Sequence, residues 1–326
     1  DLTAAIDKDL LFKLGVTKRD GGDYEGALIA FNKAIETEQN NPLYYTHRGI
    51  SKGMSGDHQG AIDDYSKAIE LEPNNDQHYT NRGLSRNKLG DLKGARDDEN
   101  RAIEINPNDS QNYYNRGISK LSSKDYQDSV SDFSKAIEIN PNEPEFFRNR
   151  GIAKNCLGNY QGAIDDYDKA IKIDPHSHLA FCNRGYSKKN LDNHQGAIND
   201  HSRALKICPD FHPSYSERGW SKSLLNDTQG AIDDYTKAIE IDQTNSDYYF
   251  QRGINKRRLG DYQSAIDDYT KTIELNPADS NAHINRGVAK KHLGDNSGAI
   301  DDYDKGIIIN PYDHLALHNR GNLKRE

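Results

Sequence analysis

Cysteine is scarce in this chain of 326 residues, and long apolar runs are missing from it. Three cysteines are too few for a disulfide framework, and an odd number leaves one of them unpaired. This favours a reducing compartment, and we expect a cytoplasmic protein. No run approaches the ~18 apolar residues of a membrane-spanning helix, and no secretory segment is visible. We therefore expect no membrane partner.

Apolar residues are also too few for a large globular core. They make up 34% of the chain, whereas charged residues make up 29%. Such a composition suits a thin core, in which each layer touches only its neighbours. The formal net charge is −8, which argues against nucleic acid as a partner.

What the chain has instead is a period of 34 residues. Prolines at 73, 107, 141, 175, 209, 277 and 311 keep this step, and Gln39 and Gln243 stand where a proline is missing. No linker interrupts the array, so we expect one domain over residues 1–326 that begins with an N-terminal extension, residues 1–7. The repeats span 8–41, 42–75, 76–109, 110–143, 144–177, 178–211, 212–245, 246–279, 280–313 and, as a partial tenth, 314–326.

Each repeat has the pattern of two helices. Counted from the first residue of a repeat, a small residue recurs at position 8, and a Gly-Asp or Asn-Asp turn such as Leu89-Gly90-Asp91 follows the first helix. The second stretch has apolar residues at helical spacing. Proline then ends the unit, because it cannot continue a helix and disfavours a helical residue before it.

These positions resemble the tetratricopeptide repeat. Glycine at position 8, alanine at 20, tyrosine or phenylalanine at 24, alanine at 27 and proline at 32 carry the resemblance over residues 8–326, and Glu99 and His201 depart from it at position 24. The resemblance implies an all-α fold, a right-handed α-solenoid superhelix of tandem helix-turn-helix repeats. The small residues let paired helices approach closely, and the aromatic ring fills the space beside them.

Positions 7 and 11 differ from the family, which usually has an apolar and an aromatic residue there. This chain has arginine at position 7 from the second repeat onward, and lysine or arginine at position 11 throughout. Position 23 is aspartate in repeats two to nine, whereas repeat one lacks both partners and has Leu14 and Ala30. We therefore predict an Arg–Asp pair inside each repeat that fixes the register of its helices. Surface pairs such as Asp63–Lys67 are predicted at i,i+4.

First-helix positions 2, 5, 6, 9, 12 and 13 line the concave face in this family, and position 6 here is mostly a carboxamide. Such a group donates and accepts, so it can pair with both groups of a peptide bond. With first helices ~8–10 Å apart, an extended chain rising ~3.3 Å per residue meets one amide about every third residue. As in the asparagine ladders of long tetratricopeptide superhelices, we predict capture of an extended polypeptide; alternatively, the amides bond neighbouring helices or solvent. The members are Asn81, Asn115, Asn149, Asn183, Gln251, Asn285 and Asn319, with His47 and Glu217 breaking the series.

Two further sets of lining residues are candidates for specificity. The aromatic set is Tyr186, Trp220 and Phe250. It would anchor a ligand, as Tyr and Trp do in binding hot spots, or pack neighbouring first helices together. The basic set is Arg257, Arg258 and Lys291. It would dock an acidic segment or a terminal carboxylate of the partner, or form a solvated basic face.

Two sequence patterns resemble catalytic or metal sites, but neither has the structural context that such a site requires. Residues 49–53 satisfy the G-x-S-x-G pattern, but Ser51 falls in the middle of a predicted helix, not at a strand-to-helix turn. His314 and His318 share a helix face without a third metal ligand nearby in the pattern. We therefore predict no enzyme, no metal and no cofactor.

The sequence thus predicts a non-enzymatic protein–protein interaction scaffold that binds an extended polypeptide segment in its concave groove. Self-assembly through the solenoid ends is the main alternative, because exposed ends of an array invite stacking. An RNA-binding scaffold is the less favoured one.

Overall fold

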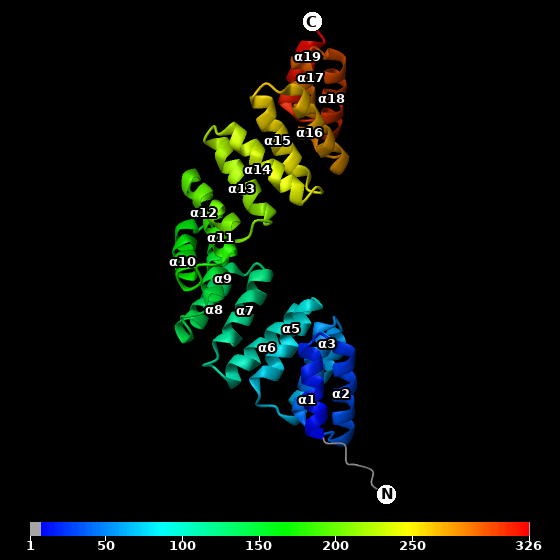
Figure 1. The fold of residues 1–326 in the computed structure, drawn as a ribbon, viewed down its shortest axis with the longest axis vertical. Helices are drawn as coiled ribbons and strands as arrows, with labels where there is room; N and C mark the ends of the chain where they lie inside the picture. Colours follow the sequence, from blue (N-terminus) through cyan, green and yellow to red (C-terminus); the bar gives the residue numbers. More distant parts are fainter. Residues whose placement is uncertain (1–7, 326) are drawn as a thin grey trace. The chain divides into compact units, whose positions relative to one another are not determined.

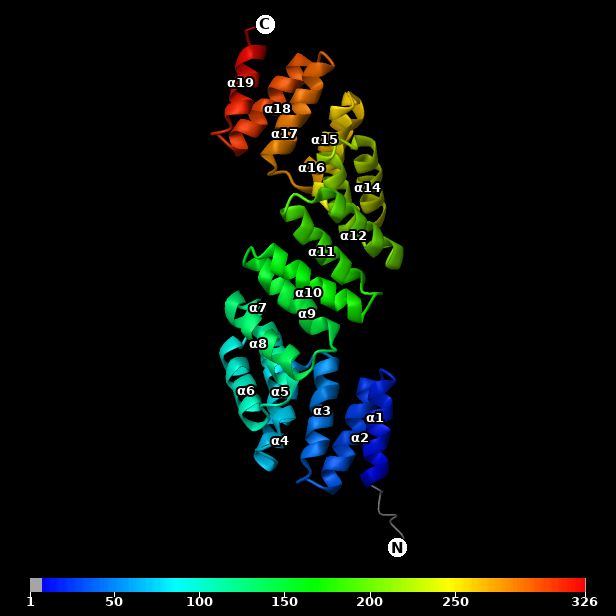
Figure 2. The same cartoon turned by 90° about the vertical axis from the view of Figure 1, so that its left-hand side faces the viewer.

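The computed structural model of the protein describes residues 8–325, so the predicted N-terminal extension lies outside the described residues. Every regular element in this part is an α-helix, and the helices pair into hairpins (Figures 1 and 2). The predicted all-α solenoid is confirmed. The described chain divides after Asn159 into two compact units. The handedness of the superhelix and the single-domain organisation stay predictions.

The helices follow the period of the sequence, with first helices odd-numbered and second helices even-numbered. The first unit contains α1 (Lys8–Asp20), α2 (Tyr24–Thr37), α3 (Pro42–Met54), α4 (His58–Leu71), α5 (Asp76–Lys88), α6 (Leu92–Ile105), α7 (Ser110–Ser122), α8 (Tyr126–Ile139) and α9 (Pro144–Cys156). The second unit contains α10 (Tyr160–Ile173), α11 (His178–Asn190), α12 (His194–Ile207), α13 (His212–Leu224), α14 (Thr228–Ile241), α15 (Ser246–Arg258), α16 (Tyr262–Leu275), α17 (Ser280–His292), α18 (Asn296–Ile309) and α19 (His314–Leu323).

The turn inside most hairpins combines a left-handed residue with a helix cap. Gly90 has φ of 80°, a conformation that glycine adopts without steric cost. The next residue, Asp91, accepts a hydrogen bond of 2.9 Å from the backbone N–H of Gly94 and so caps α6. The Gly-Asp pair predicted to end one helix therefore also begins the next.

The core is a thin layer of small residues and rings between paired helices. Ala27, Ala61 and Ala95, all at position 20, have no exposed surface. Phe133 is equally buried, and a Cβ added to Gly117 would lie 2.7 Å from the Cε1 atom of its ring. Glycine at position 8 is thus required by the ring at position 24, as the sequence predicted.

First helices lie closer to one another than second helices do. Within the two units α3 contacts α5 and α13 contacts α15, and the same holds for α1 with α3, α5 with α7, α7 with α9, α11 with α13 and α15 with α17. In the described part of the chain, second helices make no comparably extensive contact with each other. Each unit therefore bends with its first helices on the inner side, where a groove was expected.

The Arg–Asp pair inside the repeat is confirmed. Arg116 donates from Nε to Oδ2 of Asp132 at 2.9 Å and from Nη2 to Oδ1 at 2.6 Å, so the pair is bidentate. Lys120 at position 11 adds a third contact, 2.8 Å from Oδ2 of Asp132. The same pairing recurs in Arg48–Asp64, Arg82–Asp98, Arg184–Asp200, Arg218–Asp234, Arg252–Asp268 and Arg286–Asp302.

Each arginine also reaches the preceding repeat, a contact that the sequence analysis missed. Nη1 of Arg116 donates to the side-chain oxygen of Asn100 at 2.9 Å, and Nη1 of Arg252 donates to Oγ1 of Thr236 at 3.1 Å. The guanidinium of Arg116 lies 5.8 Å from the ring centre of Tyr113, within cation–π range. One side chain thus fixes the hairpin and its neighbour together.

The predicted surface pair Asp63–Lys67 is wrong. Lys67 instead pairs with Glu70 at 2.8 Å, three residues further on, and Asp63 accepts from the Gln59 amide at 3.1 Å. Both i,i+3 and i,i+4 partners share a helix face. The longer side chain of Glu70 reaches Lys67, whereas Asp63 bonds Gln59, which lies one turn earlier in the helix.

Replacing Gly117 by alanine tests the close approach of helix and ring. We expect Gly117→Ala to destabilise the protein by about 1–3 kcal/mol, because the ring of Phe133 must move. Gly83→Ala is the matched control, since the nearest atom to its Cβ is the Ala95 carbonyl oxygen at 3.3 Å and no ring blocks it. The thermal unfolding midpoint by circular dichroism should fall clearly more for Gly117→Ala. Equal falls would contradict this account.

Removing the aspartate tests the contribution of the Arg–Asp pair to stability. Asp132→Ala leaves Arg116 and Lys120 half-buried without their shared partner, so we expect a loss on the order of 3 kcal/mol. The double variant Arg116→Leu, Asp132→Ala copies the Leu14 and Ala30 of repeat one and should recover part of that loss. Chemical denaturation measures both, and a double variant no more stable than Asp132→Ala would refute the explanation.

Candidate functional site

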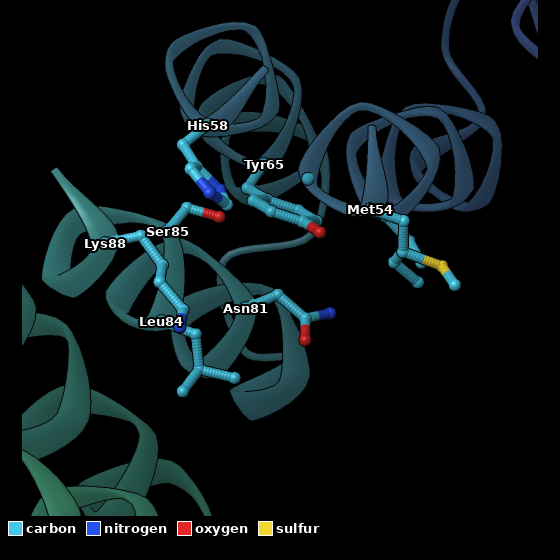
Figure 3. A pocket seen from close by; sticks show the side chains of 9 residues that line it. Met54, His58, Tyr65, Asn81, Leu84, Ser85 and Lys88 are labelled. Carbon is cyan, nitrogen blue, oxygen red and sulfur yellow. The ribbon is translucent and has the colours of Figure 1, made fainter. Parts of the chain in front are cut away.

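Two hollows lie on the inner face of the first unit, between successive first helices. One, of about 300 Å³, lies between the hairpin α3–α4 and α5, and Ile50, Met54, Asn81 and Leu84 line it (Figure 3). The other, of about 430 Å³, extends over α3, α5 and α7. It shares Ile50, Asn81 and Leu84 with the first and adds Asn115. Some of the positions predicted to line the concave face, those in repeats two to four, line these two hollows, and their role in binding stays a prediction.

The first hollow has apolar walls and a polar floor. Ile50, Met54 and Leu84 supply the walls, and Leu84 is 41% exposed. The hydroxyl of Tyr65 and the carboxamide of Asn81 project toward the same open side of the hollow (Figure 3). This combination of apolar surface with a few placed hydrogen-bonding groups is typical of ligand sites.

The amides of position 6 differ in how far they are available. Asn81 is half-buried within both hollows, and Asn183 is half-buried on α11. Asn115 and Asn149 are buried: the first accepts from Gln111 at 2.9 Å, and the second donates to the Tyr114 hydroxyl at 3.1 Å. Part of the predicted ladder is therefore engaged inside the protein.

The second unit shows the same division. Gln251 donates to Asp247 at 3.2 Å, and Asn285 donates to the backbone carbonyl of Asn281 at 2.8 Å, each within its own helix. Asn319 instead lines a hollow of about 440 Å³ together with Lys291. The remaining residues of that lining are Val288, His292 and Tyr303.

His47 and Glu217, which replace the amide at position 6, each bond a cationic side chain of the preceding repeat. Nη1 of Arg19 lies 2.8 Å from Nδ1 of His47. Burial and the charge of Arg19 lower the pKa of His47 to about 4, so its neutral ring accepts this bond. Lys189 pairs with Glu217 at 2.7 Å in the same relative position. The sequence predicted neither bond, because the partners are 28 residues apart and in different hairpins.

The structure brings two members of the aromatic set together. The Lys189 ammonium lies 4.7 Å from the ring centre of Tyr186 and 4.9 Å from that of Trp220. Both rings remain about two-fifths exposed, at 41% and 38%. Phe250 stays apart and packs its half-buried ring against Tyr269, 5.9 Å between centres. Tyr186 and Trp220 thus present apolar surface, whereas Phe250 serves packing.

Internal pairing reduces the charge of the lining. Arg148 pairs with Glu145, as Lys189 does with Glu217. Arg258 donates to Oγ of Ser223 at 2.7 Å and therefore faces α13, whereas Lys291 lines the hollow beside α19. The Nε atom of Arg257 is buried and has no hydrogen-bond partner among the described residues. The basic set keeps its charge, but its members point to different neighbours.

Comparison with protein-family models finds the tetratricopeptide repeat along most of the chain. The matched residues are 144–177, 48–110 and 250–314, and 9–41, 110–143 and 212–245. The chain belongs to the tetratricopeptide repeat family. A comparison with curated proteins gave no match.

Solved tetratricopeptide repeat proteins share the fold at low identity. One from Parabacteroides merdae is 22% identical and covers 76% of this chain and 98% of its own, with a TM-score of 0.58. YrrB, a tetratricopeptide repeat protein with an unusual peptide-binding site, is 23% identical over 58% of this chain and 97% of its own, at 0.53. A chain of the APC/C hetero-tetramer Cut9–Hcn1 is 15% identical over 97% and 76%, at 0.56. These likenesses show the fold alone, and with the repeats they support a protein-interaction scaffold.

Two repeats of this tetratricopeptide protein carry a titratable group in the aromatic layer. Burial raises the pKa of Glu99 to about 7, although bonds from Ser119 and Asn87 oppose the rise. Burial lowers the pKa of His201 to about 4, and its Nδ1 lies 3.4 Å from Oγ of Ser214. Both side chains are buried.

Other expected sites can now be placed. Ser51 is fully buried in α3 and donates to the backbone carbonyl of His47, so it cannot serve as an exposed nucleophile. Among residues 8–325, no group of three or more His, Cys, Asp or Glu side chains could hold a metal ion. None of the described helices combines the length and the hydrophobicity that crossing a membrane requires. The absence of enzymatic activity and the cytoplasmic location stay predictions.

Glu99 makes stability depend on pH. Its carboxyl group binds a proton more tightly in the folded than in the unfolded state, so its contribution is complete below pH ~4.5 and is lost as pH rises through about 7. We expect Glu99→Gln to be more stable than the wild type by about 3 kcal/mol at pH 8 and nearly equal to it at pH 4.5. Thermal midpoints of both proteins at the two pH values measure this. A difference that does not change with pH would contradict it.

Proposed function

We propose that this protein holds an extended polypeptide segment along the inner face of its first helices. The observation that supports this most is the pair of hollows in the first unit, whose lining combines apolar Ile50 and Leu84 with the half-buried carboxamide of Asn81. Apolar walls would take alternate side chains, while amides pair with the main chain. The peptide-binding site of YrrB is in keeping with this use of the fold.

The cations of the lining favour a partner with acidic residues. Lys88 lines the first hollow and Lys291 the hollow beside α19, although the whole chain has a net charge of −8. A local positive potential on an acidic protein selects acidic partners and speeds their encounter. We infer that acidic side chains of the segment lie near these lysines.

Self-association is the second candidate. On α18, on α19 and in the turn between them, Ile308, Tyr312 and Leu315 are 78%, 84% and 60% exposed. An exposed apolar surface of this kind suits contact with another protein surface. No observation favours the RNA-binding alternative.

Binding of a peptide selected from a random 12-residue library tests the groove. With the peptide blocked at both ends, fluorescence anisotropy should show about three- to tenfold weaker binding for Asn81→Ala or Asn319→Ala, the loss expected for one hydrogen bond. Asn199→Ala is the matched control, because Asn199 is exposed on the second helix α12 and bonds only Gln195.

Two results would contradict the proposal that a peptide binds in the groove. One is equal affinity of the wild type and both groove variants. The other is a library that yields no binder while light scattering shows a mass that grows with concentration, which would favour self-association.

A further inference from the structure

The ring at position 24 is a tyrosine in five repeats, and its hydroxyl has no role in packing. Phe31 and Phe133 fill the same place in repeats one and four and are fully buried. The core therefore needs only the ring, and burying an additional hydroxyl costs free energy unless it is hydrogen-bonded. The tyrosines are Tyr65, Tyr167, Tyr235, Tyr269 and Tyr303.

Two of these tyrosines line hollows on the inner face. Tyr65 lines the same hollow as Asn81, and Tyr303 lines the same hollow as Asn319 (Figure 3 for the first). The hydroxyls of Tyr235 and Tyr303 are buried and have no hydrogen-bond partner within the described residues. Burial raises the pKa of both, so each remains a neutral O–H donor.

The sequence couples each tyrosine to an amide. Sixteen residues after every tyrosine of position 24 stands an asparagine or glutamine at position 6 of the next repeat. The pairs are Tyr65–Asn81, Tyr167–Asn183, Tyr235–Gln251, Tyr269–Asn285 and Tyr303–Asn319. The two breaks in the amide series, His47 and Glu217, follow Phe31 and His201. An amide is thus present wherever the hydroxyl is.

A step is the place where a position-24 residue meets the position-6 residue of the next repeat. Three of the four steps without the tyrosine are held by a bond from the preceding repeat, whereas Asn115, which follows Glu99, bonds Gln111 of its own helix. His47, Asn149 and Glu217 each bond a side chain of the preceding repeat, from Arg19, Tyr114 and Lys189 respectively. No side chain of a preceding repeat bonds Asn81, Gln251, Asn285 or Asn319 in the part of the chain that the structure describes. At these four steps no bond from the preceding repeat holds the amide, and Gln251 and Asn285 bond only within their own helices.

We propose that a position-24 tyrosine hydroxyl and the carboxamide 16 residues later form a two-point site for the main chain of a bound polypeptide. The hydroxyl donates to a peptide carbonyl, and the carboxamide oxygen accepts a nearby peptide N–H. Neither group reads a side chain, so the site tolerates many sequences. This inference rests on the proposed function and adds which residues make the contacts.

The sites concentrate in the second unit. Tyr235–Gln251, Tyr269–Asn285 and Tyr303–Asn319 occupy consecutive steps from α14 to α19. With first helices ~8–10 Å apart and ~3.3 Å per residue of extended chain, three steps hold a segment of about nine residues. Arg257 and Lys291 belong to the same steps, which places the acidic residues of the segment there.

Removal of single hydroxyls tests the site. For the library-selected peptide, Tyr235→Phe, Tyr269→Phe and Tyr303→Phe should each weaken binding about three- to tenfold. The fold should persist, because Phe31 and Phe133 already occupy this position. Tyr126→Phe, on the second helix α8 and away from the groove, is the matched control and should bind like the wild type.

A backbone change in the peptide separates contact from structural effects. Esters replace the peptide amides one at a time, which weakens a carbonyl acceptor and removes an N–H. At the position facing Tyr303, the ester should weaken binding to the wild type but not further weaken binding to Tyr303→Phe, so the two changes are not additive. Additive losses at every position would overturn direct contact.

The outcomes also distinguish this inference from the proposed function. If the wild type binds a peptide and the three Tyr→Phe variants bind it equally well, the two-point site is wrong while the groove stands. If no library peptide binds the wild type, both are wrong.

Discussion

The arginine at repeat position 7 is the contact on which the rest of the structure depends. Arg116 holds Asp132 of its own hairpin with two hydrogen bonds, Asn100 of the preceding repeat with a third, and lies against the Tyr113 ring. A chain with 34% apolar residues has only a thin core to align its helices. The guanidinium group of arginine is planar and donates in fixed directions. It therefore fixes the alignment of the paired helices, which a thin core does not fix by itself.

This use of charge also shapes the groove. Lys120 and six equivalents at position 11 bind the aspartate of the Arg–Asp pair, so these cations are not available to a ligand. Arg148 and Lys189 are neutralised by acids of the lining itself. The positive potential that remains is concentrated at a few side chains such as Lys88 and Lys291. An acidic protein can therefore offer a local basic surface.

Position 24 shows how one place in the repeat supports different properties. Phenylalanine there contributes packing alone, tyrosine adds a hydroxyl to the buried ring, and Glu99 and His201 bring titratable groups into the core. Burial shifts the pKa of Glu99 up to about 7 and that of His201 down to about 4, so both favour their neutral forms. The groove therefore varies from step to step, although the backbone repeats.

The sequence by itself determined the period, the helices and the Arg–Asp pairs, because these depend on residues that recur in register within 34 residues. The sequence also showed that repeat one lacks the pair, because Leu14 and Ala30 stand in place of the arginine and the aspartate. The bonds of Arg19 to His47 and of Lys189 to Glu217, the burial of Asn115 and Asn149, and the packing of Phe250 were decided by tertiary structure alone. Each depends on how one hairpin lies on the next, and the distances between side chains of different repeats follow from that packing and from no pattern within a repeat.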